Sequence, residues 1–303
     1  MGRNRYSDGS HAPASYFQGG LKAVLTEVKA FSSWRSAPTL PLIENGRSEM
    51  DLIQLRNIDG LDPVKASVST TPYGAVDGAS HTGSSVLTRN IVLTLHPNPD
   101  WDTWTYESLR RLLYSYFIPK KETRLVFLSD DLIPVEISGI VESCEVNMFS
   151  KDPELLVSII CPDPYFTSVD PVVITGQTSR EGVDPRLVEY NGTVESGINA
   201  KITWVADPTP SLIEIRFGDP EISHFTEPAT VSEQMYWELS SIPMRKFVQN
   251  VNLGSGVINN LLSKVIPGST WPTLQPGENE LYIITDQGEQ DYELSYFERF
   301  GGL

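Results

Sequence analysis

The sequence predicts a mainly β protein with two domains and one α-helix set into the first of them. Three observations support this prediction. The chain has 303 residues, which is long for one compact core and comfortable for two. Short apolar or alternating segments, separated by turn residues, recur along the whole length. One segment, residues 103–117, instead repeats its apolar residues at helical spacing.

The first predicted domain, residues 51–166, begins with segments typical of β-strands. Val64, Ala66 and Val68 alternate with polar residues, which indicates a strand with one buried face. The strands expected in this domain are residues 52–58, 64–70, 89–96, 124–129, 133–139, 140–149 and 155–161. They predict a β-sandwich or a barrel-like domain.

The helix is predicted from five apolar residues that fall on one face. These are Leu109, Leu112, Leu113, Tyr116 and Phe117. Arg110 and Arg111 point away from that face. Pro119 cannot continue the helix and marks its end.

The last two strands of the domain are expected to pair as a hairpin with residues 151–154 as the turn. This register gives one apolar face. Its pairs are Met148 with Val157, Val146 with Ile159, and Cys144 with Cys161. Each cysteine lies in an apolar strand pattern, where a thiol is usually a small buried hydrophobe. Opposed positions would also permit a disulfide in an oxidising setting.

The second predicted domain, residues 167–303, is again rich in short strands and turns. The expected strands are residues 172–175, 187–191, 200–205, 212–217, 236–239, 246–251, 280–285 and 292–297. Pro276 and Gly277 form a turn directly before one of them. This density of strands predicts a β-sandwich or jelly roll.

Several segments of the first domain together resemble the amino-terminal domain of bacteriophage distal tail (Dit-like) proteins, a siphophage-type tail component. They are residues 57–64, 72–78, 89–93, 116–120 and 161–166. The second domain resembles the galectin-like domain of the same family. The resemblance implies a structural virion protein that forms a ring, typically a hexamer, at the tail tip or baseplate. That ring would join the tail tube to the host-adhesion apparatus.

The same resemblance implies partners and a location. The expected partners are copies of the chain itself, the tail tube, the hub or tail-tip protein and the receptor-binding protein. The expected location is the virion, after assembly in the cytoplasm of the host bacterium, where thiols stay reduced.

Residues 1–50 fall outside the resemblance and are expected to form a partly disordered extension. Leu21, Val24, Leu25 and Val28 repeat at helical spacing, which predicts a short amphipathic helix. This helix could lie on its own domain or pack on a neighbouring subunit.

The composition excludes two classes of partner. The net charge is −16, and from Phe166 onward 19 acidic and 8 basic residues give −11. Such a balance opposes binding to a phosphate backbone, which needs clustered Lys and Arg. No apolar run approaches the roughly 20 residues needed to span a bilayer, so insertion into a membrane is not expected.

Catalysis is not expected, and neither is a cofactor. The four histidines are scattered without metal-ligand spacing, and no phosphate-binding or nucleophile motif occurs. Asp130 and Asp131 could serve a glycosidase in principle, but their place between two strands indicates a solvated turn. Gly254 and Gly256 lie in a segment too short to cradle a phosphate and also indicate a turn.

An alternative function is carbohydrate binding through the second domain. Trp204, Trp237 and Trp271 could supply an aromatic platform for a sugar ring. Trp204 lies within a strand pattern, which favours a place in the core. Trp271 follows a Gly-Ser-Thr loop and is the candidate contact for a glycan or a partner.

Overall fold

The computed structural model describes residues 21–28, 39–44, 52–74, 76–99, 102, 104–129, 133–147, 153–180, 185–204, 212–218, 223–226, 235–286 and 289–303. The chain forms two compact units. One comprises Met1–Val169 and Gly301–Leu303, and the other comprises Asp170–Phe300. Both are built from β-strands, with one α-helix among the described residues, so the predicted mainly β fold is confirmed.

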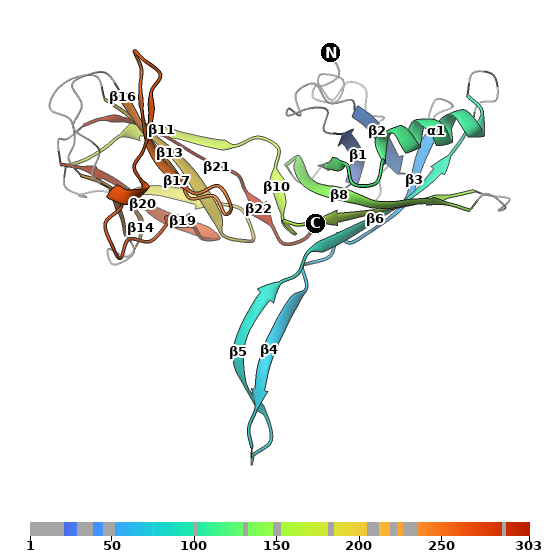
Figure 1. Cartoon of the computed structure of the whole chain (residues 1–303), viewed down its shortest axis with the longest axis horizontal. Coiled ribbons are helices and arrows are strands. Elements are labelled where there is room, and N and C mark those ends of the chain that lie inside the picture. The colour runs from blue at the N-terminus through green and yellow to red at the C-terminus, as the bar shows by residue number, and fades with distance from the viewer. Residues whose placement is uncertain are drawn as a thin grey trace. The chain divides into compact units, whose positions relative to one another are not determined.

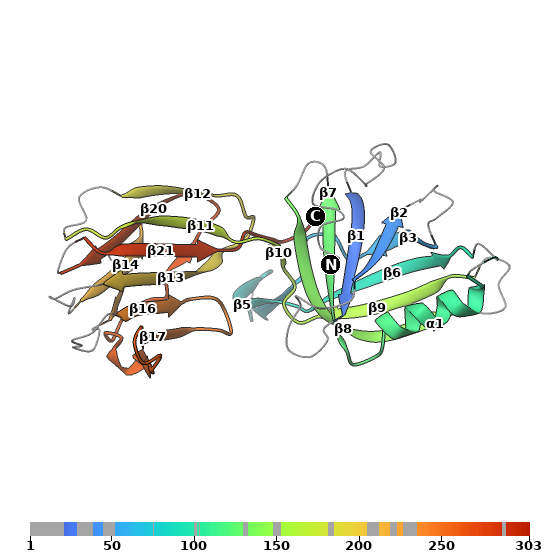
Figure 2. The same cartoon turned by 90° about the horizontal axis from the view of Figure 1, so that it is seen from above.

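Seven strands of the first unit close into a barrel. They are β1 (Leu21–Val28), β2 (Thr39–Glu44), β3 (Ile53–Asp59), β6 (Arg89–Pro97), β7 (Glu122–Ser129), β8 (Val135–Val146) and β9 (Leu155–Cys161). The order is β8-β7-β1-β2-β3-β6-β9, and β9 pairs back with β8 (Figure 2). Among these seven described strands, only β2 and β3 pair in parallel. A further strand, β10 (Phe166–Ser168), pairs with β8.

The barrel is filled by the alternate residues of its strands. In β6 and β9 every second side chain is buried, including Ile91, Leu93 and Val157. Closure leaves each of the seven strands with a neighbour on both sides, which satisfies their backbone groups. Between β3 and β6 the chain forms a separate two-stranded sheet, β4 (Ala66–Pro72) and β5 (Ala79–Val86), seen extending from the barrel strands in Figure 1.

The helix α1 (Tyr106–Tyr116) begins three residues later than predicted. Thr105 caps it, because its side chain accepts from the Ser108 backbone N–H at 3.3 Å while the Ser108 hydroxyl accepts from the Thr105 N–H at 2.9 Å. Leu109 and Leu113 are fully buried, as is Phe117 just beyond the helix. The predicted apolar face is therefore the face that packs.

The helix predicted at Leu21, Val24, Leu25 and Val28 is wrong, because this segment is the strand β1. Its backbone pairs with β7 on one side and β2 on the other. Two ladders give hydrogen-bond partners to both edges of the segment, and these outweigh a short helical repeat. The second strand, β2, also comes from the part predicted to be an extension.

The predicted hairpin register is also wrong. In the structure Val146 lies opposite Leu155 and Cys144 opposite Val157, four residues from the predicted partners. The two strands predicted at 133–139 and 140–149 are one strand, β8, with a bulge between Val141 and Ser143. Because the bulge adds one residue, the core-facing side changes from odd to even positions there. The turn at residues 151–154 lies partly outside the described residues.

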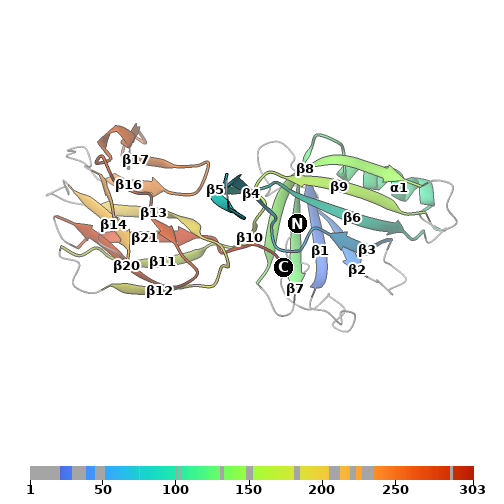
Figure 3. The same ribbon diagram turned by 90° about the horizontal axis from the view of Figure 1, so that it is seen from below.

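The second unit is a sandwich of two sheets. The larger has the order β11-β21-β13-β16-β17-β18, with β19 beside β13. The strands β11, β21, β13, β16 and β17 of this sheet are labelled in Figure 3. Its strands are β11 (Val172–Gln177), β13 (Ser196–Trp204), β16 (Met235–Ser240), β17 (Phe247–Asn252), β18 (Ile258–Asn260), β19 (Thr273–Leu274) and β21 (Asp291–Tyr296). The smaller contains β12 (Arg186–Tyr190), β20 (Gly277–Thr285), β14 (Ile213–Phe217) and β15 (Ser223–Thr226), in this order.

One hydrophobic cluster lies between these two sheets. Ile202 and Trp237 enter it from the larger sheet, and Val188 and Ile215 from the smaller. Outside the two sheets, a short 3-10 helix spans Leu262–Lys264, and β22 (Arg299–Phe300) ends the unit. The sandwich architecture was predicted; its likeness to galectins remains a prediction.

Candidate interaction surfaces

Reactive side chains do not converge in the part of the chain that the structure describes. No group of three or more His, Cys, Asp or Glu side chains could hold a metal ion there. His81 lies in β5 and His96 in β6, on different sheets. Asp130 and Asp131 lie outside the described residues, as does His11. Gly254 lies in a turn whose N–H donates to the Asn252 side chain at 2.8 Å.

None of the helices described reaches the length and apolarity that crossing a membrane requires.

The β4–β5 hairpin is exposed on both faces. Every residue of β4 is exposed, and Val68 retains 59% of its surface. The prediction that residues 64–70 have a buried face is therefore wrong for the single chain. The alternation itself is present, because Ala66, Val68 and Val86 share one face while Ser67 and Ser85 share the other.

This hairpin is unusual for a surface element. Residues 66–86 carry one carboxylate, Asp77, and no Lys or Arg. Edge strands that face water normally carry charges, which prevent pairing with other chains. An isolated two-stranded hairpin is also marginally stable in water. Composition and geometry together make this hairpin the candidate interaction surface of the first unit.

Arg89 connects several backbone segments of the first unit. It is 7% exposed, and its guanidinium donates to four backbone carbonyls. Nη1 donates to Gly60 at 2.5 Å and to Asp62 at 2.7 Å. Nε donates to Pro164 at 2.6 Å, and Nη2 donates to Gly301 at 2.6 Å. Three segments far apart in the sequence are thus held by one residue.

The carboxy-terminal residues belong to this cluster. The Gly301 carbonyl also accepts from Val64 N–H at 3.0 Å, and Leu303 N–H donates to Leu61 at 3.0 Å. A Cβ at position 302 would lie 2.8 Å from the backbone nitrogen of Pro63, so glycine is required for this approach. A hollow of about 500 Å³ lies beside the cluster, lined by residues 58–65 and 87–90.

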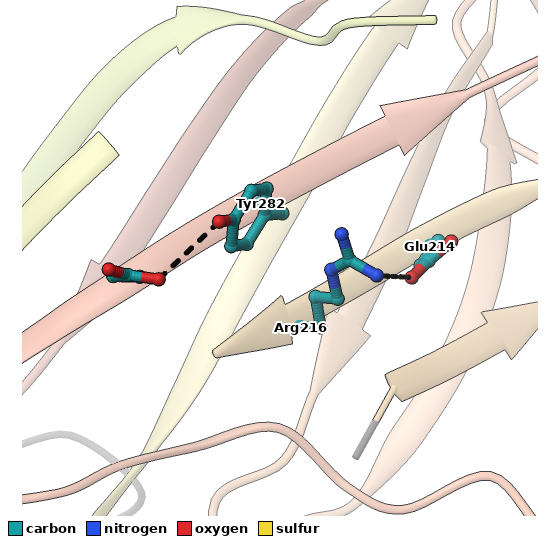
Figure 4. A network of polar contacts seen from close by, with 4 residues as sticks. Glu214, Arg216 and Tyr282 are labelled. Atoms are coloured by element: carbon teal, nitrogen blue, oxygen red, sulfur yellow. Dashed lines mark hydrogen bonds and ion pairs between the residues drawn. The ribbon is translucent and has the colours of Figure 1, made fainter. Parts of the chain in front are cut away.

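The smaller sheet of the second unit carries a polar cluster on its outer face (Figure 4). Arg216 Nη1 lies 3.3 Å from Glu214 Oε1, and its guanidinium carbon lies 4.5 Å from the centroid of the Tyr282 ring. Burial raises the pKa of Glu214, while Arg216 lowers it. Tyr282 Oη lies 3.4 Å from Glu280 Oε2. Each side chain has a partner in the cluster, which is typical of a stabilising contact.

The structure places two of the three tryptophans against the sandwich core. Trp237 is 0% exposed in the sandwich core. Trp271 is partly buried against that core, with Lys246 Nζ 5.4 Å from its ring centroid. Trp204 lies on β13, and its side chain is outside the described ones. Contact of Trp271 with a glycan or partner stays a prediction.

The two cysteines are free thiols. Cys161 lies opposite Arg89 in β6, whereas Cys144 lies opposite Val157, so the predicted opposition of the two cysteines is absent. Burial raises the pKa of Cys161 from 9.0 to about 12 and that of Cys144 to about 11. Both thiols are therefore protonated at neutral pH.

Labelling with a disulfide reagent at pH 8 is expected to be at least about tenfold slower in the native protein than in urea, because the thiolate is the nucleophile. Since folding raises both pKa values, stability is retained below pH 9 and falls as pH rises above it. The variant Cys144→Ser should leave one slow thiol, Cys161. Equal rates in native and unfolded protein would contradict the burial of these thiols.

The described site thus consists of surfaces without a reactive centre. Sequence reasoning missed both leading features. The hairpin had a readable signal, the nearly uncharged run of residues 66–86. Arg89 had none, because its partners come from three separate segments.

The described residues define a mainly β protein of two units, with a barrel, one helix and an exposed hairpin in the first unit and a β-sandwich in the second. Residues 48–164 match the family model of the phage tail protein RIFT-related domain. This match lies in the first unit and spans most of the segments on which the resemblance to distal tail (Dit-like) proteins rests, so it supports that resemblance.

The fold is shared with a solved Dit protein. The Dit protein of phage SPP1, described as a paradigm of the hub adsorption apparatus in phages infecting Gram-positive bacteria, has a TM-score of 0.61 and 14% identity. The match covers 83% of this chain and 95% of that one.

Two phage p2 baseplate chains, in the activated conformation with Sr and with Ca, are more distant, each at 10% identity. Their TM-scores are 0.46 and 0.45, with 91% and 93% of this chain and 97% and 99% of theirs covered. No curated protein is detectably similar in sequence.

Proposed function

We propose that the chain is a structural component of a phage tail tip or baseplate, and that six copies form a ring joining the tail tube to the host-adhesion apparatus. The phage tail domain at residues 48–164 supports the tail role. The number six comes from the resemblance to distal tail proteins. The role needs neither catalysis nor a cofactor, and it places the protein in the virion after assembly in the host cytoplasm.

The exposed β4–β5 hairpin carries this proposal. Its backbone edges and the side of Ala66, Val68 and Val86 are free to pair with a second surface. A ring needs heterologous contacts, in which one patch meets a different patch on the next subunit. A hairpin reaching from each barrel to its neighbour supplies such a contact, and burial on the neighbour supplies the stability that the hairpin lacks alone.

The purified chain is expected to have the mass of six copies of the 33.7 kDa protein in light scattering or native mass spectrometry. Val68→Lys should break the ring into folded monomers, since a charge would enter a buried apolar contact. Ser67→Lys is the matched control and should keep the ring, because this neighbouring exposed side chain lies on the opposite face. Both variants should fold, since neither side chain packs within its own chain.

A deletion variant tests the whole hairpin. The Leu87 N–H donates to the Lys65 carbonyl at 3.1 Å, so the ends of residues 66–86 already lie together. Replacing these residues with a two-residue Gly-Ser link should give a folded monomer. A wild-type chain that stays monomeric at high concentration, or a ring that survives loss of the hairpin, contradicts the proposal.

Carbohydrate binding through the sandwich is the second candidate. It is favoured by the hollowed outer face of the larger sheet, which Lys201 and Glu293 line in two places. Binding would serve the same assembly by holding the tail tip to a host surface.

A further inference from the structure

One face of the larger sheet presents a continuous row of polar side chains. The register places Thr175 beside Glu293 and Glu293 beside Lys201. It also places Lys201 beside Glu238 and Glu238 beside Gln249. The row crosses β11, β21, β13, β16 and β17, which lie in this order in Figure 3. With strands about 4.8 Å apart, it is about 19 Å long.

The strands beneath this row are anchored in the sandwich core. The residues that flank the row along β13, β16 and β21 point into the core, where Ile202, Trp237 and Leu294 all have 0% solvent exposure. Side chains on such strands are positioned more accurately than side chains on loops. The row therefore has the fixed geometry that a binding site needs.

The face is hollowed in two adjoining places. One hollow of about 440 Å³ lies over β11, β21 and β13. A second of about 430 Å³ lies over β13, β16 and β21. Lys201 and Glu293 line both, so the two hollows adjoin and follow the row.

Hydrogen-bond donors and acceptors alternate along this face. Gln249 Nε2 donates to Glu238 Oε2 at 2.7 Å, and Gln177 Nε2 donates to Asp291 Oδ1 at 3.1 Å. Each carboxylate and amide retains further lone pairs or N–H groups. A sugar hydroxyl both donates and accepts, so it can bind between such neighbours.

The charged side chains and aromatic rings that line the two hollows indicate which class of ligand fits this face. Three carboxylates, Asp291, Glu293 and Glu238, line the hollows with two cations, Lys201 and Arg245. This balance opposes a phosphate-rich or carboxylate-rich polymer. The second hollow is also lined by Phe247 and Phe297, whose rings offer apolar surface to the C–H face of a sugar.

We propose that this outer face binds a neutral oligosaccharide chain laid across the strands. The site is distinct from Trp271, which packs against the sandwich core. The assignment rests on the second candidate function, carbohydrate binding through the sandwich, and it uses a single chain, so it does not depend on ring formation. The two proposals can therefore fail separately.

The test is a glycan array that carries neutral oligosaccharides and a matched set of sulfated and phosphorylated ones. The array is probed with the 303-residue protein. At least one neutral oligosaccharide should bind to the protein. In titrations with that oligosaccharide, the variants Glu293→Gln and Lys201→Met should each bind at least about tenfold more weakly than the unsubstituted protein. Glu189→Gln is the control, because Glu189 is exposed on the smaller sheet. Circular dichroism checks that each variant is folded.

Three results would overturn the assignment. The first is no binding to any neutral oligosaccharide at about millimolar concentration, a range that corresponds to weak but specific affinity. The second is preferred binding of the sulfated or phosphorylated set. The third is binding that is lost in Trp271→Ala and retained in both row variants.

Discussion

Replacing Arg89 with methionine is expected to destabilise the first unit by about 3–5 kcal/mol. Hydrogen bonds to a charged group contribute about 1.5–3 kcal/mol each, and their loss is not additive. The substitution would leave the carbonyls of Gly60, Asp62, Pro164 and Gly301 without this donor. It would also remove the guanidinium that lies 4.6 Å from the centroid of the Phe166 ring.

Thermal unfolding followed by circular dichroism should show the midpoint of the first unit falling by roughly 10 °C. Hydrogen exchange should speed up in residues 60–64 and 301–303 before the remainder of the barrel, because Arg89 holds the carbonyls of both segments. Arg111→Met is the matched control, since Arg111 is exposed on α1, and it should change stability by at most about 0.5 kcal/mol. A midpoint for Arg89→Met equal to that of the control would refute the role given to this side chain.

Trp237→Ala is expected to cost the second unit about 3–5 kcal/mol, the range for truncating a fully buried aromatic side chain. Its ring lies in the single cluster between the two sheets, where no neighbouring strand can move to fill the space without breaking a ladder. Its indole N–H finds no hydrogen-bond partner among the described residues, so the loss reflects packing.

Urea denaturation monitored by near-ultraviolet circular dichroism measures this effect. Trp271→Ala provides the comparison and should cost only about 1–2 kcal/mol, because its ring is partly buried. Equal losses of stability in the two variants would contradict the conclusion that Trp237 is more deeply buried than Trp271.

Local patterns predicted those elements whose stability comes from their own residues and one buried face. The strand β9 has the predicted bounds, 155–161, because every second residue meets the core. The helix near Leu109 was readable for the same reason, although its start was set by the Thr105 cap. In the second unit each predicted strand corresponds to an observed one, since strong alternation and turn residues mark it.

Predictions failed where a distant partner or an extra residue decided the outcome. Residues 21–28 have helical spacing, yet β7 and β2 hold them as a strand. The strands β8 and β9 pair four residues away from the predicted register, which separates Cys144 from Cys161, and a bulge in β8 shifts the pairing by one further residue. Val68 has the alternation of a half-buried strand, but no described part of its own chain covers it.

The functional features also differ in whether the sequence alone could predict them. The absence of a reactive motif and the phage tail resemblance were readable from residue types and their order. The cluster at Arg89 and the polar row through Lys201 were not, because each joins residues from strands that are neighbours only after folding.

The amino-acid order alone determined that this protein is mainly β, with two units and the helix near Leu109, because periodicity and turn chemistry act over a few residues. The tertiary structure alone decided that the barrel takes two strands from the first 50 residues and that Gly301 returns to the first unit. Backbone pairing between distant segments depends on which strand edges become neighbours in the folded chain. The local sequence of one strand does not specify its distant partner.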